Sequence, residues 1–134
     1  MFATKISTMT LRLELFVDDL PTSMDFYHRV LRFETAEGQT DGYTSITNGK
    51  VQLGLNLRSN LPDDHPIQSR SKERPGRGVE IVLEVNDIEE MYQYVITQNW
   101  PVSDQLQHQP WGLTDFRVLD PDGYYLRITS RFRQ

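Results

Sequence analysis

The sequence contains no cysteine, and this absence excludes several kinds of chemistry. Without thiols the chain has no disulfide framework, no thiolate metal site and no cysteine nucleophile. No apolar run reaches the length of about 20 residues that a membrane-spanning helix needs, and the N-terminal residues lack the apolar core of a signal peptide. We therefore expect a cytoplasmic protein that has no membrane partner.

Positive charge is also scarce, with 14 Lys and Arg residues against 19 Asp and Glu residues and a formal net charge of −5. Non-specific binding to nucleic acid or to an anionic membrane needs a basic face. The composition therefore argues against both kinds of partner. With 134 residues, 37% of them apolar, the chain is large enough for one hydrophobic core. We expect a single domain that spans residues 1–134.

Two segments have nearly the same pattern. Residues 11–20 (LRLELFVDDL) and residues 79–88 (VEIVLEVNDI) both alternate apolar and polar side chains, and both run through Val-x-Asp-[Leu/Ile] into a predicted helix. Alternation with a period of two places the apolar and polar sets on opposite faces of a strand. An internal repeat of this kind predicts two similar structural modules.

Each copy continues in the same order. In the first, Asp19 is a predicted helix N-cap, and Asn48-Gly49 between two alternating runs predicts a hairpin. In the second, Asp87 is the predicted N-cap, Glu90 is its capping-box partner, and Asp120-Pro-Asp-Gly123 predicts a tight turn. Both copies therefore consist of a strand, a helix and three strands. The predicted boundaries are 10–58 for the first module, 59–77 for a connecting segment and 78–131 for the second module.

The predicted fold class is α+β, with two paired βαβββ modules that form a curved mixed sheet. Helices cover only one face of each sheet, so the polar faces either contact water or face each other across a ligand cleft. A half-exposed antiparallel sheet gives the same alternation, and the pattern alone leaves both alternatives open. The residues predicted to line a cleft are the polar sets of the strands, namely Arg12, Glu14, Phe16, Gln52, Asn56, Glu80, Val82, Glu84, Tyr125 and Arg127.

Four short motifs occur in a specific order: Asp19-Leu20, Phe26-Tyr27, Val85-x-Asp87 and Asp120-Pro-Asp-Gly123. In this order and spacing the sequence resembles the vicinal oxygen chelate superfamily, which includes glyoxalase I, extradiol dioxygenases and bleomycin-resistance proteins. The resemblance covers residues 10 to 131. It implies a pair of βαβββ modules whose curved sheets enclose a central cleft.

The metalloenzymes of this superfamily bind a divalent metal through His or Glu at four strand positions. The resemblance places three of these positions at Arg12, Glu80 and Arg127, and the remaining one near Gly54. Arginine offers no lone pair, and Glu80 alone cannot make a metal site. We therefore predict no metal and no cofactor, and an ion pair of Glu80 with Arg12, Arg127 or both. The histidines are expected in the first helix, the connection and a loop, at His28, His65 and His108.

The segment Gln109-Pro-Trp-Gly112, which leads into Asp115-Phe-Arg117, most resembles the bleomycin-resistance branch. Members of that branch are metal-free proteins that sequester a ligand in clefts at a dimer interface. The resemblance implies a small-molecule binding protein and a homodimer, for which a strand near Lys50 to Leu57 could provide an edge. Trp111 is the candidate ligand contact, or else it plugs the end of the cleft or the dimer seam.

The chemistry of the ligand stays open at this point. Glu14 and Glu84 are compatible with a cationic ligand, whereas Arg12 and Arg127 permit an anionic one. Two other function classes also remain. One is a vicinal oxygen chelate enzyme, such as a lyase, isomerase or dioxygenase, with non-standard metal ligation or acid-base chemistry at a carboxylate. The other is an interaction protein that uses the fold without a ligand.

Overall fold

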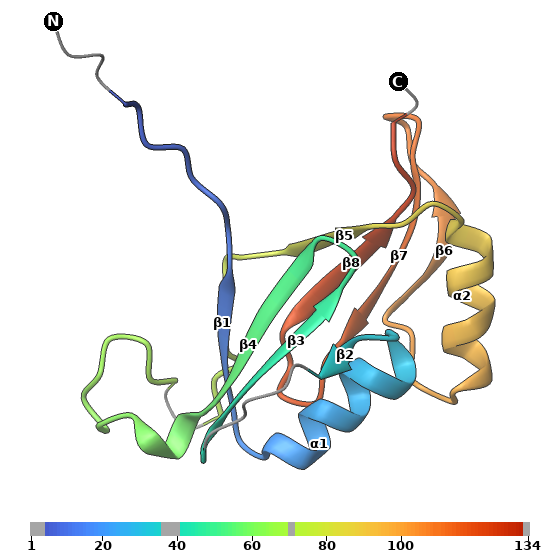
Figure 1. The fold of residues 1–134 in the computed structure, drawn as a ribbon. Coiled ribbons are helices and arrows are strands. Elements are labelled where there is room, and N and C mark those ends of the chain that lie inside the picture. The colour runs from blue at the N-terminus through green and yellow to red at the C-terminus, as the bar shows by residue number, and fades with distance from the viewer. Residues whose placement is uncertain (1–4, 36–40, 70–71, 133–134) are drawn as a thin grey trace, which may run out of the picture.

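The computed structural model describes residues 5–35, 41–69 and 72–132, and its strands form two four-stranded sheets (Figure 1). The first sheet has the order β1-β4-β3-β2, and the second has the order β5-β8-β7-β6. β1 pairs in parallel with β4, and β5 pairs in parallel with β8, whereas all other strand pairs are antiparallel. The predicted α+β fold of two βαβββ modules is confirmed. The strands are β1 (Leu13–Val17), β2 (Glu34–Thr35), β3 (Tyr43–Asn48), β4 (Val51–Leu57), β5 (Ile81–Glu84), β6 (Asp104–His108), β7 (Thr114–Leu119) and β8 (Tyr125–Thr129).

The helices begin at the predicted caps. The Asp19 side chain accepts a hydrogen bond from the backbone N–H of Thr22 (3.0 Å), and Asp87 accepts one from the N–H of Glu90 (3.1 Å). These caps satisfy N–H groups that have no partner inside the helix. The helices are α1 (Leu20–Asp25), which continues into a π-helical turn η1 (Phe26–Val30), α2 (Ile88–Thr97), and a short 3₁₀ turn η2 (Arg58–Asn60).

The predicted capping box of α2 is only half formed. The Glu90 carboxylate binds the Arg32 guanidinium through two contacts of 2.7 Å instead of returning to the Asp87 N–H. A bidentate, charge-assisted pair is stronger than a neutral N–H contact. The pair also joins the helical segments of the two modules.

The two predicted turns are confirmed. Asn48 pairs with Val51 across the hairpin, and Gly49 has a φ of 57°, which favours glycine. In the second turn the N–H of Gly123 donates to the Asp120 carbonyl (3.0 Å).

The expected edge strand was assigned wrongly. Residues Lys50 to Leu57 were predicted to offer an edge, but β4 is central and pairs with both β1 and β3. β3 lies on one side of β4, and β1 lies parallel to β4 on the other side. In the described part of the chain, β1 and β2 are the outer strands of the first sheet, and β5 and β6 are those of the second.

The apolar faces of both sheets and the helices form one core. The modules meet through the helices: the Phe26 and Trp100 rings lie 4.6 Å apart, and the Tyr94 hydroxyl donates to the Arg29 carbonyl (2.7 Å). Trp100 is therefore a packing residue, as expected. No helix of the described residues has the length and apolarity required to cross a membrane. The fully buried core side chains include Val17, Phe26, Tyr27, Val30, Leu55, Val95, Phe116, Val118 and Leu126.

Candidate functional site

The polar face of the second sheet holds an ion-pair network centred on Glu80. One Glu80 oxygen lies 3.5 Å from Nη1 of Arg127, and the other accepts a hydrogen bond from Nε of Arg117 (3.1 Å). The predicted pair of Glu80 with Arg127 is therefore confirmed. Among the described residues, Arg12 forms its ion pair with Glu14 (3.0 Å) and none with Glu80.

Arg117 was not among the predicted site residues, although the alternation of apolar and polar residues in its strand indicates its position. Phe116 and Val118 are both buried in the core, so the alternation of β7 places Arg117 on the polar face. The sheet register then sets it directly opposite Arg127. Burial lowers the pKa of Arg117, but its hydrogen bond with Glu80 and the charge of Asp115 outweigh burial and raise that pKa.

Asp115 lies in the same network and is fully buried. One of its carboxylate oxygens accepts a hydrogen bond from the Gln109 side chain (2.8 Å) and lies 3.5 Å from Nη1 of Arg117. Gln109 begins the loop that carries Trp111, so this contact fixes the loop over the polar face. Two buried polar atoms of the network, Oδ2 of Asp115 and Nε of Arg127, have no hydrogen-bond partner within the described residues.

Tyr125 extends the network toward the edge of the sheet. Its hydroxyl donates to Asp104 (3.0 Å), and the Arg74 guanidinium lies 5.6 Å from its ring centroid. Burial, together with this hydrogen bond to Asp104, raises the pKa of Tyr125. The hydroxyl is therefore a permanent donor at neutral pH.

The polar face of the first sheet holds a separate cluster around Glu14. The Glu14 carboxylate forms an ion pair with Arg12 (3.0 Å) and accepts a hydrogen bond from the Asn56 amide (3.2 Å). It lies over Gly54, the residue opposite Glu14 in β4. A side chain at Gly54 would collide with the Glu14 carboxylate and would come within 2.9 Å of the Tyr43 hydroxyl. The absence of a side chain at Gly54 therefore makes room for this carboxylate.

Six of the predicted cleft residues thus form two clusters: Arg12, Glu14 and Asn56 beside the first sheet, and Glu80, Tyr125 and Arg127 beside the second. Among the described residues, no hydrogen bond or ion pair joins the Glu14 cluster to the Glu80 network. Phe16 is held at its backbone, where its N–H and carbonyl both bond to the Tyr124 hydroxyl (3.1 and 2.9 Å). The Gln52 amide reaches the Ser45 hydroxyl (3.5 Å), and Trp111 is 49% exposed on its loop.

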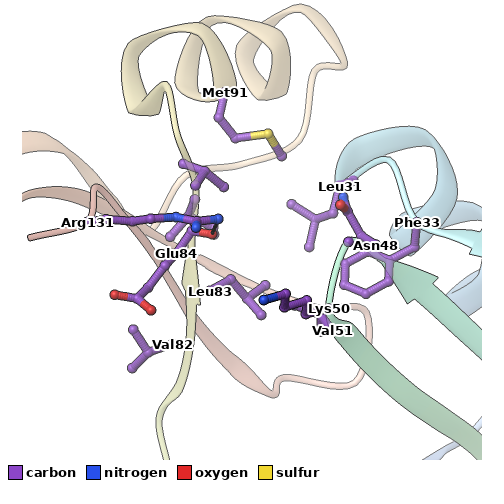
Figure 2. A pocket seen from close by; sticks show the side chains of 13 residues that line it. Leu31, Phe33, Asn48, Lys50, Val51, Val82, Leu83, Glu84, Met91 and Arg131 are labelled. Carbon is purple, nitrogen blue, oxygen red and sulfur yellow. Dashed lines mark hydrogen bonds between the residues drawn. The ribbon is translucent and has the colours of Figure 1, made fainter. Parts of the chain in front are cut away.

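A pocket that the sequence did not predict lies where the two modules meet (Figure 2). It has a volume of about 420 Å³ and lies between β5 and the turn that joins β3 to β4. Val82 and Glu84 of the predicted cleft set line it, together with apolar residues such as Leu83 that the alternation had placed in the core. The pocket depends on how the modules pack, which periodicity within one strand cannot reveal. Its apolar lining includes Leu31, Phe33, Val51, Val82, Leu83, Met91 and Ile128, and its polar lining includes Asn48, Lys50 and Arg131.

A divalent metal does not fit the residues at the four superfamily positions. Arg12 and Arg127 carry guanidinium groups, which offer no lone pair and repel a cation, and Gly54 has no side chain. Both oxygens of Glu80 are already engaged by arginines. The described residues also contain no group of three or more His, Asp and Glu side chains placed to hold a metal ion.

Two βαβββ modules, each with one polar sheet face, define a class of α+β proteins, and a direct comparison shows the family. A family model described as the Glyoxalase/Bleomycin resistance protein/Dioxygenase superfamily matches residues 9–128. The chain belongs to this superfamily. No curated protein matches the chain.

Solved structures show the same fold at low sequence identity. A glyoxalase/bleomycin resistance protein/dioxygenase from Nocardioides is 19% identical with a TM-score of 0.76, and covers 96% of this chain and 87% of its own. A superfamily member from Sphaerobacter thermophilus is 22% identical with a TM-score of 0.71, covering 93% and 98%. A lactoylglutathione lyase from Agrobacterium tumefaciens is 19% identical with a TM-score of 0.70, covering 94% and 96%. At these identities the likeness establishes the fold alone.

Proposed function

We propose that this protein is a metal-free small-molecule binding protein of the bleomycin-resistance type, which sequesters an organic ligand on its polar sheet faces. The observation that carries the proposal is the Glu80 network. Glu80 is the one carboxylate at the four superfamily metal positions, and Arg117 and Arg127 engage both of its oxygens. A carboxylate held in this way supports the sheet face and does not coordinate a cation.

The ligand is a polar organic molecule that both donates and accepts hydrogen bonds. The exposed part of the Glu80 network offers both kinds of contact, because the Glu80 carboxylate is an acceptor and the Arg127 guanidinium a donor, with 33% and 26% of their side chains exposed. The two groups lie 3.5 Å apart at the polar face of the second sheet. Trp111, on the loop fixed by Gln109, supplies an aromatic surface for stacking.

Tryptophan emission tests the proposal, because the two tryptophans lie in different environments. In a titration with a panel of cationic, anionic and neutral aromatic compounds, we expect saturable quenching of the wild type and of Trp100→Phe. Trp111→Phe should lose this response. Arg127→Gln should weaken the affinity about tenfold, which corresponds to about 1.4 kcal/mol, whereas the exposed control Arg77→Gln should leave it unchanged.

Two outcomes would overturn the proposal. No saturable response from any compound would favour an interaction protein without a ligand. Turnover of a compound that depends on an added divalent metal would favour the alternative, a vicinal oxygen chelate enzyme with non-standard ligation.

A further inference from the structure

The pocket between the two modules reaches into the hydrophobic core. Its volume of about 420 Å³ is typical of small-molecule sites, which range from about 300 to 1,000 Å³. Leu31, Phe33 and Ile128 line it and are at most 2% exposed, so the pocket opens onto buried apolar side chains. None of the residues at the four superfamily metal positions lines it. The pocket is therefore separate from the polar site proposed above.

Both modules build the walls of this pocket. The first module contributes the turn between β3 and β4, where the Asn48 amide donates to the carbonyls of Leu31 (3.1 Å) and Arg32 (3.3 Å). These hydrogen bonds hold the turn against the end of η1. The second module contributes β5 and Met91 of α2, and Figure 2 shows the Met91 side chain pointing into the space. The pocket is therefore formed by residues that the fold already holds in place.

Two cationic side chains lie at the mouth of the pocket. Lys50 and Arg131 are both exposed, and Figure 2 shows them reaching toward the pocket from opposite walls. Nη2 of Arg131 donates to the Glu84 carbonyl (3.3 Å), which holds the guanidinium beside β5 and uses only one of its five donors. Among the described residues neither cation forms an ion pair, so both can bind an anion.

The Glu84 carboxylate does not cancel this positive charge. Figure 2 shows it directed toward Val82 and away from Leu31 and Met91. Among the described lining residues it is the one acidic group, so the lining has a formal charge of +1 in a chain whose net charge is −5. A buried apolar surface with a cationic mouth is complementary to a molecule that has an apolar body and an anionic head.

We propose that this pocket binds an amphipathic carboxylate, whose apolar chain lies against Leu31, Phe33 and Met91 and whose head group bonds to Lys50 and Arg131. Ammonium and guanidinium groups both form charge-assisted hydrogen bonds with carboxylates. At about 30 Å³ for each water-sized group, the pocket holds about 14 such groups, which suits a carboxylate of about ten carbons. This is a second site that does not depend on the proposed binding at the polar sheet faces.

Isothermal titration calorimetry tests the proposal with decanoate and with decylamine, which carries the same chain on a cationic head. The wild type should bind decanoate saturably and decylamine at least about tenfold more weakly. Lys50→Gln/Arg131→Gln should weaken decanoate binding at least about tenfold and remove this preference. The control Lys72→Gln/Arg77→Gln removes the same charge from the exposed connecting segment and should leave both affinities unchanged.

A second pair of variants tests the apolar part of the site. Val51 lines the pocket at the start of β4 and is partly exposed, so Val51→Phe places a ring in the pocket without disturbing the fully buried core. It should weaken decanoate binding at least about tenfold. Val79→Phe adds the same ring at a side chain that is 60% exposed and lies outside the pocket, and it should leave the affinity unchanged.

Three outcomes would overturn the proposal. One is the absence of saturable decanoate binding, and another is equal affinity of the wild type for decanoate and decylamine. The third is decanoate binding that persists in Lys50→Gln/Arg131→Gln but is lost in Arg127→Gln, because the anion would then bind the Glu80 network. Quenching of Trp111 by the compound panel should be the same in Lys50→Gln/Arg131→Gln as in the wild type, so it reports separately on the proposed function.

Discussion

Replacing Asp120 with alanine is expected to lower the free energy of unfolding by about 3 to 5 kcal/mol, because it leaves buried donors without their acceptor. The Asp120 carboxylate accepts hydrogen bonds from the fully buried Tyr27 hydroxyl (2.8 Å) and from the backbone N–H groups of Asp122 and Tyr124 (2.9 Å each). These contacts join the helix of the first module to the turn before β8. Urea unfolding followed by tryptophan emission measures the loss, and a value below about 1 kcal/mol, that of a single exposed contact, would contradict it.

The pH dependence of stability gives Asp120 a second signature. Burial raises its pKa from 3.8 to about 6, although the hydrogen bond from Tyr27 opposes this shift. The folded state therefore binds this proton more tightly than the unfolded state does, so the contribution of Asp120 to stability increases as the pH falls from about 7 to about 4. At 1.36 kcal/mol per pKa unit the whole shift corresponds to about 3 kcal/mol, of which about 2.4 kcal/mol is gained between pH 7 and pH 4.

The control for this signature is Asp120→Asn. Asparagine keeps one oxygen for the N–H groups of Asp122 and Tyr124, and its amide can donate to the Tyr27 oxygen. It does not titrate, so the stability of the wild type minus that of the variant should increase as the pH falls from 7 to 4. The other carboxylates are present in both proteins, and their contributions cancel. A difference that stays constant over this range would show that Asp120 has an ordinary pKa.

The second large effect is expected for Phe26→Ala, which should cost about 3 to 5 kcal/mol through the cavity it leaves. Phe26 is completely buried, and its ring lies 4.6 Å from Trp100 and 4.9 Å from Tyr27. Since Trp100 follows the helix of the second module, the substitution loosens the packing between modules, and Trp100 emission should shift to longer wavelength. The matched control is Phe132→Ala, at a side chain that is 63% exposed, and it should change stability by no more than about 0.5 kcal/mol. Equal effects at the two positions would contradict this assignment of the core.

The fold could be predicted from the sequence because its signals are local and occur twice. The alternation of residues 11–17 and 79–85, the caps at Asp19 and Asp87, and the turn after Asn48 each depend on neighbouring residues. The predictions that were wrong concerned features that depend on contacts between segments distant in the sequence. Glu90 binds Arg32 across the module boundary instead of completing its own capping box. Likewise β4 became central because β1 returns to pair with it.

The candidate site was predictable only in part, for the same reason. The pair of Glu80 with Arg127 follows from neighbouring strands of one sheet and was found. Arg117 could have been found by applying the same alternation to β7. The burial of Asp115 beneath the Gln109 side chain could not have been predicted from the sequence, because it depends on the path of a loop.

The central feature of the proposed site is that guanidinium groups take the place of metal ligands on these sheet faces. Dialysis against nickel, manganese, ferrous iron and zinc, followed by elemental analysis, tests this claim in the wild type and in Glu80→Gln. We expect less than one metal ion per chain in both proteins, with no difference between them. One divalent ion per chain in the wild type, lost in Glu80→Gln, would contradict it.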